Sequence, residues 1–396
     1  MSAAELIYDP YDYEIDADPY PVFRRMRDEA PLYHNEQYGF YALSRFEDVL
    51  EASLDHETFS SARGTVIELM DQPMKNPPMI FMDPPAHTRF RKLVGHALTP
   101  RRVRELEPRI RELAAGYLDA FVGSGGFDFV SDFSARLPVM VISSLLGVPE
   151  EDQEQLRIWT DLTLHREPGE TGMSQAARDA SGDITSYWQK HIADRRRQPR
   201  DDMMSDLMRG ELEQDDGSTR KLSDGELYAF YLLLSSAGNE TVARLLGWAA
   251  ILLARNPGER EKLVRDPALI PGGVEELLRF EAPSPVQARW VMRDVEYYGQ
   301  VVPRDSKITL LTASANRDER EFPDPDRLDV TRQIDRHMSL GFGIHFCLGA
   351  SLARMEGRVA LEETLRRFPT WDLEEEGLQM IHTSTVRGYS QVPIRF

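Results

Sequence analysis

The chain has 396 residues, of which 41% are apolar and 9% aromatic, so it can bury a substantial core and is not a disordered polymer. Its 47 basic and 66 acidic residues give a net charge of −19, which disfavours binding to nucleic acids and to anionic membrane surfaces. The single cysteine, Cys347, excludes an internal disulfide, a CxxC redox pair and a zinc site built from several cysteines.

The N-terminal segment and the most apolar segment do not have the patterns of targeting or membrane sequences. The first residues, MSAAELIYDPYDYEIDADPYPVF, lack the basic and apolar regions of a signal peptide. The apolar stretch Leu227–Ala254 is interrupted by Asn239, Glu240 and Arg244, and charged groups at mid-span are costly in lipid. We therefore expect a buried helix, no membrane span and a cytoplasmic protein.

In chain order, the first elements are a short strand and a long helical region. The alternation in Tyr38–Leu43 predicts the strand, and apolar residues at helical spacing predict mostly helix from about Pro100 to Arg209. The polar, acidic segment Asp201–Lys221 predicts an exposed helix and loop.

A long central helix follows this region. Ser223 and Glu226 form a capping-box pattern at its start, and Asn256-Pro257-Gly258 predicts its end. Roughly 30 residues at 1.5 Å per residue make it about 45 Å long, enough to cross a whole domain. Because it is apolar nearly all round, we expect it to be central.

The C-terminal third combines helices with small β elements. Gly258–Phe280 predicts further helix, DVEYYGQVVPRDSKITLL a hairpin, and RDEREFPDPDRLDVTR a meander without regular structure. The cysteine segment, one more helix and the β-like ending RGYSQVPIRF complete the chain. The whole pattern predicts a mainly α (α+β) fold with small β-sheets in one large domain, residues 1–396.

Cys347 lies in GFGIHFCLGA, a glycine-rich segment that leads into the predicted helix SLARMEGRVALEETL. A sulfur at a helix N-terminus meets amide donors and the positive end of the helix dipole, which stabilise a thiolate. Such a thiolate suits a metal ligand or a nucleophile, and a small buried thiol beside a tight turn is the alternative. Haem iron needs a single protein ligand, and thiolate is one of its known axial ligands.

This segment resembles the haem-binding loop of the bacterial-type soluble cytochrome P-450 (haem-thiolate monooxygenase) family, with the pattern Phe-(Gly/Ser)-x-Gly-x-His-x-Cys-x-Gly. The matching positions are Gly341, Gly343, His345, Cys347 and Gly349, while Leu340 replaces the leading aromatic residue. The resemblance implies a triangular, mainly helical fold around one haem b. It also implies that Cys347 coordinates the iron and that His345 and Gly349 contact the cofactor.

Ala237-Gly238-Asn239-Glu240-Thr241 lies in the middle of the long helix. A glycine inside a helix costs about 1 kcal/mol relative to alanine, so Gly238 needs a reason, such as room for a flat cofactor and dioxygen. Glu240 and Thr241 suit a proton relay. Alternatively, Thr241 bonds an upstream carbonyl and Glu240 pairs with Arg244. The segment resembles the family's oxygen-activation motif, which implies catalytic roles for Glu240 and Thr241 and a cofactor contact for Gly238.

Glu276 and Arg279 are three residues apart and share one helix face, which by spacing alone predicts only a surface ion pair. The pair is similar to the family's Glu-x-x-Arg motif, and Pro325-Asp326-Arg327-Leu328 is similar to its Pro-Glu-Arg-Phe pattern. The resemblance implies a buried, structural ion cluster in which Arg327 is the third partner.

The segment between Pro84 and Arg104 has no acidic residue but several basic ones, which predicts either a solvated basic face or a site for an anion. Its part DPPAHTRFRKLV is similar to the family's haem-gripping helix. This implies that His87 and Arg91 bind the haem propionates, together with Arg289 and His345. With Arg336 and Arg354, the other basic residues are expected to form a positive patch for an acidic electron-transfer partner.

The resemblance extends from about Asp9 to Phe396 and implies insertion of one oxygen atom of O2, most simply as hydroxylation, into a hydrophobic small molecule of terpenoid, steroid, lipid or polyketide type. No G-x-G-x-x-G segment follows a strand. Electrons are therefore expected from an external ferredoxin and its NAD(P)H-dependent ferredoxin reductase. We expect a monomer, and a substrate pocket lined by Ser60–Met82, Val286 and the turn Ser384–Val386.

Three other functions remain open at this point. A peroxide-driven haem peroxygenase typically carries an arginine where this chain has Glu240-Thr241. A non-catalytic haem-binding sensor would not need a proton relay. An enzyme that uses Cys347 as a nucleophile without haem would leave the basic residues around His87 without a purpose.

Overall fold

The computed structural model describes residues 6–71, 74–95, 98–164, 173–383 and 385–396. The helices are α1 (Tyr13–Ala17), α2 (Tyr20–Glu29), α3 (Phe46–Leu54), α4 (Ala86–Gly95), α5 (Pro100–Asp119), α6 (Arg136–Leu146), α7 (Glu150–Leu164), α8 (Gln175–Arg197), α9 (Met203–Arg209), α10 (Asp224–Arg255), α11 (Pro257–Arg265), α12 (Ile270–Phe280), α13 (Thr312–Ala315) and α14 (Ala350–Arg367). The strands are β1 (Leu32–Asn35), β2 (Phe40–Leu43), β3 (Phe59–Ser60), β4 (Gly126–Asp128), β5 (Glu211–Glu213), β6 (Thr219–Lys221), β7 (Gln287–Val291), β8 (Val295–Tyr297), β9 (Gln300–Val302), β10 (Lys307–Leu310), β11 (Asp372–Leu373), β12 (Gln379–His382), β13 (Arg387–Gln391) and β14 (Pro393–Arg395).

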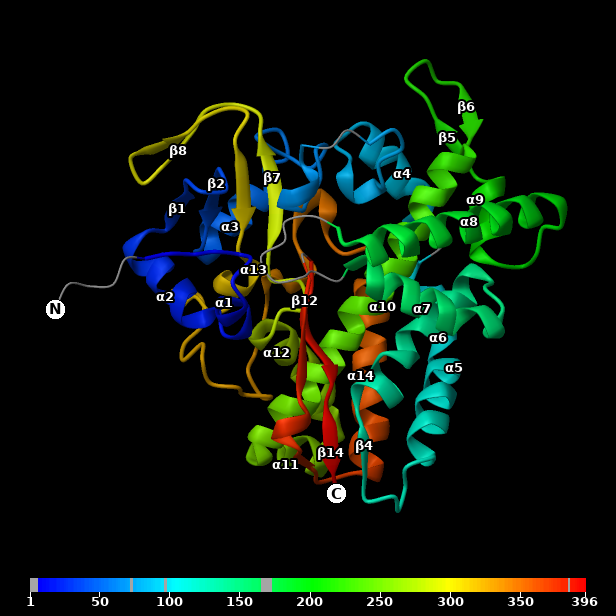
Figure 1. Ribbon diagram of the computed structural model, residues 1–396, viewed down its shortest axis with the longest axis vertical. Helices are drawn as coiled ribbons and strands as arrows, with labels where there is room; N and C mark the ends of the chain where they lie inside the picture. The colour runs from blue at the N-terminus through cyan, green and yellow to red at the C-terminus, as the bar shows by residue number, and fades with distance from the viewer. Residues whose placement is uncertain (1–5, 72–73, 96–97, 165–172, 384) are drawn as a thin grey trace.

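The largest sheet and the main helices lie on opposite sides of the molecule (Figure 1). The sheet has the strand order β1-β2-β10-β7-β3, with β10 parallel to β2 and the other pairs antiparallel. Smaller sheets are β11-β14-β4, β12-β13, β5-β6 and β8-β9. The ribbon is broad at the level of β8 and β6 and narrows toward α11 and β4 (Figure 1). The structure thus confirms the expected mainly helical architecture with small sheets.

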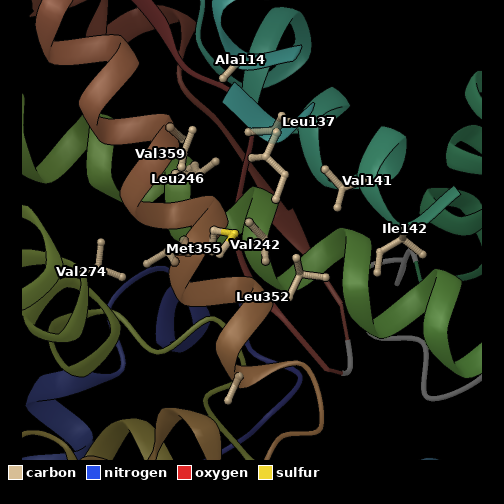
Figure 2. Close-up of a cluster of buried hydrophobic side chains, with 14 of the residues drawn as sticks. Ala114, Leu137, Val141, Ile142, Val242, Leu246, Val274, Leu352, Met355 and Val359 are labelled. Carbon is tan, nitrogen blue, oxygen red and sulfur yellow. The ribbon is translucent and has the colours of Figure 1, made fainter. Parts of the chain in front are cut away.

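Helix α10 is the predicted central helix. Ser223 accepts a hydrogen bond from the backbone of Glu226, the Glu226 side chain accepts one from the backbone of Ser223, and the helix ends at Arg255 as expected. It packs against α6, α8 and α14. Figure 2 shows apolar side chains of these and neighbouring helices meeting in the core: Ala114, Leu137, Val141, Ile142, Val242, Leu246, Val274, Leu352, Met355 and Val359.

The segment Asp201–Lys221 differs from the exposed helix and loop expected from its acidity. Helix α9 buries Met203, Met204, Leu207 and Met208, because these residues repeat at helical spacing and form an apolar face against the core. The rest of the segment forms the β5-β6 hairpin rather than an irregular loop. The net charge of a segment does not reveal which of its residues share one face.

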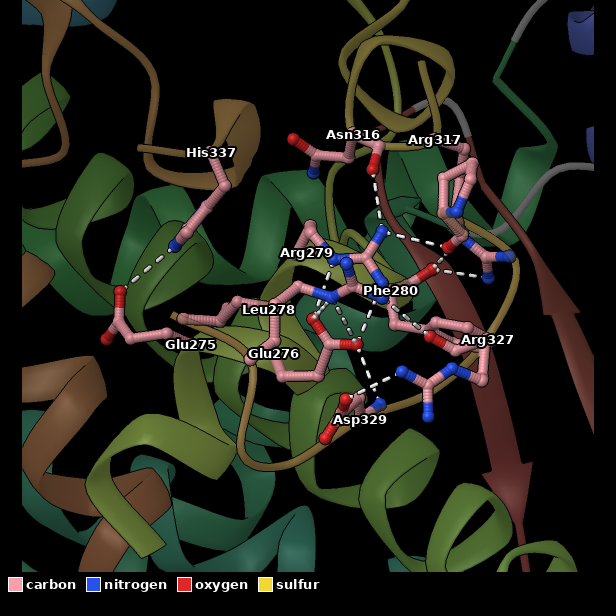
Figure 3. Close-up of polar contacts among 12 residues, drawn as sticks. Glu275, Glu276, Leu278, Arg279, Phe280, Asn316, Arg317, Arg327, Asp329 and His337 are labelled. Atoms are coloured by element: carbon pink, nitrogen blue, oxygen red, sulfur yellow. Dashed lines mark hydrogen bonds and ion pairs between the residues drawn. The ribbon is translucent and has the colours of Figure 1, made fainter. Parts of the chain in front are cut away.

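Glu276 and Arg279 of α12 form a completely buried ion pair, not a surface pair. Both side chains are 0% exposed, and the guanidinium binds the carboxylate through Nε (2.6 Å) and Nη2 (2.8 Å) (Figure 3). Arg279 Nη1 also donates to the carbonyls of Asn316 (2.8 Å) and Pro325 (3.0 Å). The pair therefore ties α12 to the segments that follow α13.

The prediction that Arg327 is the third partner of this cluster is wrong. Its side chain is 61% exposed and binds Asp329 instead (2.9 Å). The third partner is Arg332, whose Nε lies 3.3 Å from Glu276 Oε2 and whose Nη1 donates to the carbonyl of Pro323 (2.7 Å). The meander turns at this point, so that the arginine five residues further along faces inward.

Replacing each arginine separately distinguishes the two positions. Arg332→Ala should lower the free energy of unfolding by about 3 kcal/mol, because it leaves part of the buried Glu276 charge without a partner. Arg327→Ala should cost no more than about 1 kcal/mol, since it removes only an exposed pair. Urea unfolding of the holoprotein followed by circular dichroism measures both, and equal losses would contradict the assignment.

Candidate functional site

The segment around Cys347 forms a tight loop before α14. The Cys347 N–H donates to the carbonyl of Leu340 (2.8 Å) and closes the loop. Gly341 and Gly343 have φ of 67° and 66°, a conformation that favours glycine. A Cβ at position 343 would also lie 2.9 Å from the carbonyl oxygen of Ser53 in α3. The glycines of this segment are therefore required by its fold.

The Cys347 thiol lies among several groups that favour its ionised form. Burial raises its pKa, whereas a hydrogen bond from the backbone of Gly349 and the charges of Arg91 and Arg354 lower it. Burial dominates, so the expected stabilisation by the helix end does not by itself produce a thiolate. A cation bound at Sγ would supply the missing stabilisation, which suits a metal ligand better than a free nucleophile.

A cluster of basic side chains lies beside this loop. His87 of α4 is 1% exposed, and its ring centroid is 4.5 Å from that of His345. Arg289 of β7 and Arg91 of α4 are close enough to act electrostatically on His345. Arg91 Nη2 donates to the carbonyl of Phe346 (2.6 Å) and so joins α4 to the cysteine loop.

The cluster has the properties of an anion site. Three buried ring nitrogens have no hydrogen-bond partner among the described residues: Nδ1 and Nε2 of His87, and Nε2 of His345. Arg289 is buried and forms no ion pair with any described residue; its Nη1 donates to the carbonyl of Ala288 (2.7 Å). Among the residues that the structure describes, Asp83 is the only carboxylate whose charge acts on His87 and Arg289.

The pKa shifts of the cluster have the same cause. Burial and the charge of Arg91 lower the pKa of His87 to about 4, and burial with the charges of Arg289, His87 and Arg91 lowers that of His345 to about 3. Burial lowers the pKa of Arg289 to about 10. Two carboxylates of a ligand would reverse these shifts and use the free donors. The residues therefore fit a haem, with its single thiolate ligand and two propionates.

In α10, Thr241 and Glu240 both make the local contacts that the sequence offered as an alternative to a proton relay. Thr241 Oγ1 donates to the carbonyl of Ala237 (2.8 Å), and Glu240 Oε2 accepts from Arg244 Nη2 (2.5 Å). Glu240 is buried, but Ala237 is exposed and Thr241 is half-buried, although both lie in the middle of the central helix. This turn of α10 thus presents a small side chain and a hydroxyl to open space.

The structure gives a packing reason for Gly238. A Cβ at this position would lie 2.7 Å from Cγ1 and 2.8 Å from Cδ1 of Ile142. The absent side chain therefore allows close packing of α10 on α6. At Gly349, in contrast, an added Cβ would meet no neighbouring atom within 4 Å.

The expected positive patch is largely neutralised. Arg354 binds both carboxylate oxygens of Glu275 (2.7 and 2.8 Å), and Arg336 binds Glu321 (2.9 Å). Burial would raise the pKa of Glu275, but hydrogen bonds from Arg354 and His337 lower it to about 2. Figure 3 shows the contact between Glu275 and His337. Arg89 and Lys92 of α4 pair with acidic residues of the β5-β6 hairpin and the turn it encloses.

Sequence reasoning missed two residues of α7 that reach the α10 motif. Asp161 hydrogen-bonds Glu240, and Arg157 Nη1 binds Asp161 Oδ2 (2.6 Å). The i, i+4 spacing of Arg157 and Asp161 predicts an ion pair, but no sequence signal tells which side of α7 faces α10.

A pocket lies beside the N-terminal segments. Val286 and Val386, for which contact with the substrate is expected, line it together with Tyr8, Ile67 and Ala288. Of the expected turn, Ser384 lies outside the described residues. Within Ser60–Met82, where residues 72 and 73 also lie outside them, Met79 is part of the core, while Ile80 and Met82 are half-buried.

In the part of the chain that the structure describes, no single helix has the length and apolarity of a membrane span. One bent pair of segments, Val130–Leu146 with Glu150–Thr163, passes that test together.

A mainly helical fold with one buried cysteine beside unpaired cationic groups is typical of haem-thiolate proteins. A family model described as Cytochrome P450 matches residues 156–266 and 269–393. The chain is 43% identical over 394 residues, 98% of its length and 97% of the relative's, to cytochrome P450 123 of Mycobacterium tuberculosis. It is 37% identical over 385 residues (95% and 93% covered) to the vitamin D(3) 25-hydroxylase of Pseudonocardia autotrophica.

The fold of this chain also matches that of solved cytochrome P450 structures. The solved structure of the bacillaene polyketide synthase cytochrome P450 PksS from Bacillus subtilis 168 superimposes with a TM-score of 0.88 at 35% identity, covering 98% of this chain and 99% of that one. The chain therefore belongs to the cytochrome P450 family. It is a monooxygenase, and the family uses haem and dioxygen.

Proposed function

We propose that this protein hydroxylates a hydrophobic small molecule with one oxygen atom of O2, on a haem b whose iron Cys347 holds through Sγ. The observation that carries the proposal is the half-buried Cys347 next to a cluster of basic side chains for which Asp83 is the only counter-charge among the described residues. When bound, the haem supplies the iron at which dioxygen is activated.

The basic cluster would hold the two propionates of the haem. His87 and Arg289 are buried, and Arg91 and His345 are half-buried. The ring nitrogens of His87 and the Nε2 atom of His345, which have no partner among the described residues, are suited to bind an anion. Leaving such donors unpaired is costly, so an anionic ligand also stabilises the fold around them.

The iron ligand is tested by the absorption of the reduced protein with carbon monoxide. The wild type should show the red-shifted Soret band of a thiolate-ligated haem, and Cys347→Ser should lose it because the sulfur is gone. Thr241→Ala serves as the matched control and should keep the band. A correctly folded wild-type holoprotein without this band would refute the proposal.

Glu240 and Thr241 are proposed as the groups that deliver protons during oxygen activation. The Thr241 hydroxyl donates a hydrogen bond to the carbonyl of Ala237. The lone pairs of its oxygen can still accept a further hydrogen bond. Glu240 lies next to it in the chain and is held by Arg244, which fixes the orientation of its carboxylate. This pair also argues against the peroxide-driven and sensor alternatives.

Removing the Thr241 hydroxyl should uncouple oxygen use from product formation. In Thr241→Ala we expect the product formed per O2 consumed to fall by about tenfold or more, because proton delivery contributes factors of this size or larger. Thr241→Ser keeps the hydroxyl and should retain most of the coupling. Oxygen-electrode traces with product quantification measure the ratio, and an unchanged ratio would contradict the relay role.

A hydrophobic substrate is supported by the pocket residues and by the relatives. Val286, Val386 and Ile67 form an apolar part of the pocket wall, whose remaining part includes the charged residues Asp16 and Arg387. The names of two relatives, a vitamin D(3) 25-hydroxylase and a polyketide cytochrome P450, refer to large, mostly apolar molecules. We therefore place the substrate among terpenoids, steroids, lipids and polyketides.

A spectral titration of the purified holoprotein tests this substrate class. Apolar compounds of these types should displace water at the iron and shift the Soret band to shorter wavelength, with saturation at micromolar concentrations. Charged, polar compounds of equal size are the control and should give no shift. A shift confined to the polar set would contradict the proposed class.

Electrons are proposed to come from NAD(P)H through a ferredoxin reductase and a ferredoxin. The surface next to Cys347 supports a docking site there, because Phe346 is 39% and Leu54 is 52% exposed near the loop. Since Arg336 and Arg354 are ion-paired, apolar contact contributes more to this docking than the expected positive patch.

We further propose a cytoplasmic monomer whose residues 1–396 form one domain. One hydrophobic cluster draws buried residues from Met79 to Ile394, which supports a single cooperative unit.

A further inference from the structure

Two acidic side chains meet between helices α7 and α10. Asp161 of α7 and Glu240 of α10 are hydrogen-bonded to each other. The acid–alcohol pair described above uses Glu240 but gives no role to Asp161, which no motif of the sequence indicates.

Each acid has its own arginine. Arg157 Nη1 lies 2.6 Å from Asp161 Oδ2, and Arg244 Nη2 lies 2.5 Å from Glu240 Oε2. Arg157 also binds Glu154 (2.8 Å), and Arg244 Nη1 donates to the carbonyl of Tyr389 in β13 (2.6 Å). The charged groups that α7 and α10 turn toward this contact are thus two carboxyls and two guanidiniums, and β13 adds a carbonyl.

The hydrogen bond between the two carboxyls requires a proton. An ionised carboxylate only accepts hydrogen bonds, so one of the two groups must be protonated to donate. Glu240 has the stronger reason to be ionised, because its ion pair with Arg244 is buried on both sides, where opposite charges attract more strongly, whereas Arg157 is shared between Asp161 and Glu154. Asp161 is therefore the donor.

The two acids differ in their access to water. The Asp161 side chain is 37% exposed, whereas that of Glu240 is 6% exposed. A proton that passes through Glu240 to Thr241 is therefore supplied more readily by Asp161 than directly by solvent.

We propose that Asp161 is a positioning and proton-holding residue that orients Glu240 and supplies it with a proton from solvent. The inference deepens the proposed function and rests on it. In each step the carboxylic acid of Asp161 gives its proton to the Glu240 carboxylate as that proton is drawn on toward Thr241, so that Glu240 ends the step ionised again. Asp161 then takes a proton from water, and Arg157 stabilises its carboxylate in the interval.

The pKa shifts of Asp161 and Glu240 set an upper pH limit for this proton transfer. Burial and the neighbouring Glu240 raise the pKa of Asp161 to about 8, while Arg157 and Arg244 act in the opposite direction. Burial would raise the pKa of Glu240, but Arg244 and the hydrogen bond from Asp161 lower it. Asp161 is consequently protonated below about pH 8 and loses its proton above it, so the relay should fail on the alkaline side.

Infrared spectroscopy of the holoprotein detects the proton directly. The wild type should show the carbonyl stretch of a protonated carboxylic acid that disappears with a midpoint near pH 8, and Asp161→Asn should remove it. Burial also raises the pKa of Glu356 to about 8, so Glu356→Gln is needed to identify the band of that residue. If no band is lost in Asp161→Asn, the proposal is overturned. If the variant does not fold, the wild-type titration alone tests the proposal, and the absence of a band with a midpoint near pH 8 overturns it.

The turnover measurement shows whether the proton is used. Product per O2 should fall above about pH 8 in the wild type and should be at least about tenfold lower in Asp161→Asn, without that pH dependence. Glu154→Gln is the matched control, since it changes the other partner of Arg157 but not the acid pair, and should behave as the wild type. Wild-type coupling and pH dependence in Asp161→Asn would overturn the proposal.

Failure of the proposed function is distinguishable from failure of this inference. A missing thiolate band with carbon monoxide refutes the haem-thiolate assignment, while the infrared titration reports on Asp161 independently of turnover.

Discussion

A charge removed from water must be neutralised inside the protein, and this constraint organises both the core and the candidate site. In α12, Glu276 satisfies it with Arg279 and Arg332, and the resulting cluster joins the helix to the meander. Around His87 and Arg289 the described polypeptide supplies little opposite charge, apart from Asp83. The same rule that makes the first cluster structural makes the second one a candidate binding site for an anion.

The sequence was informative where function depends on short, contiguous segments. The loop around Cys347 and the capping box at Ser223 are local patterns, so their structures follow from the order of the residues. The basic stretch near His87 was recognisable because it lacks acids in a chain of net charge −19. These segments together were sufficient for the family and the fold.

The errors arose where a long-range contact decides the outcome. Arg327 and Arg332 lie in the same meander, and only the path of its turns determines that Arg332 faces Glu276. The close approach of Gly238 to Ile142, almost a hundred residues earlier, is a contact that no sequence pattern indicates. Asp161 has no motif at all, because its significance lies in a contact with another helix.

The close approach of Gly343 to the Ser53 carbonyl has a consequence for how the protein is made. The two residues are nearly three hundred positions apart, so the loop that carries Cys347 rests on a helix formed from the beginning of the chain. Contacts of such large sequence separation form slowly and only after most of the chain is available. The loop that carries Cys347 therefore acquires its final shape late in folding, after the contact with α3 has formed.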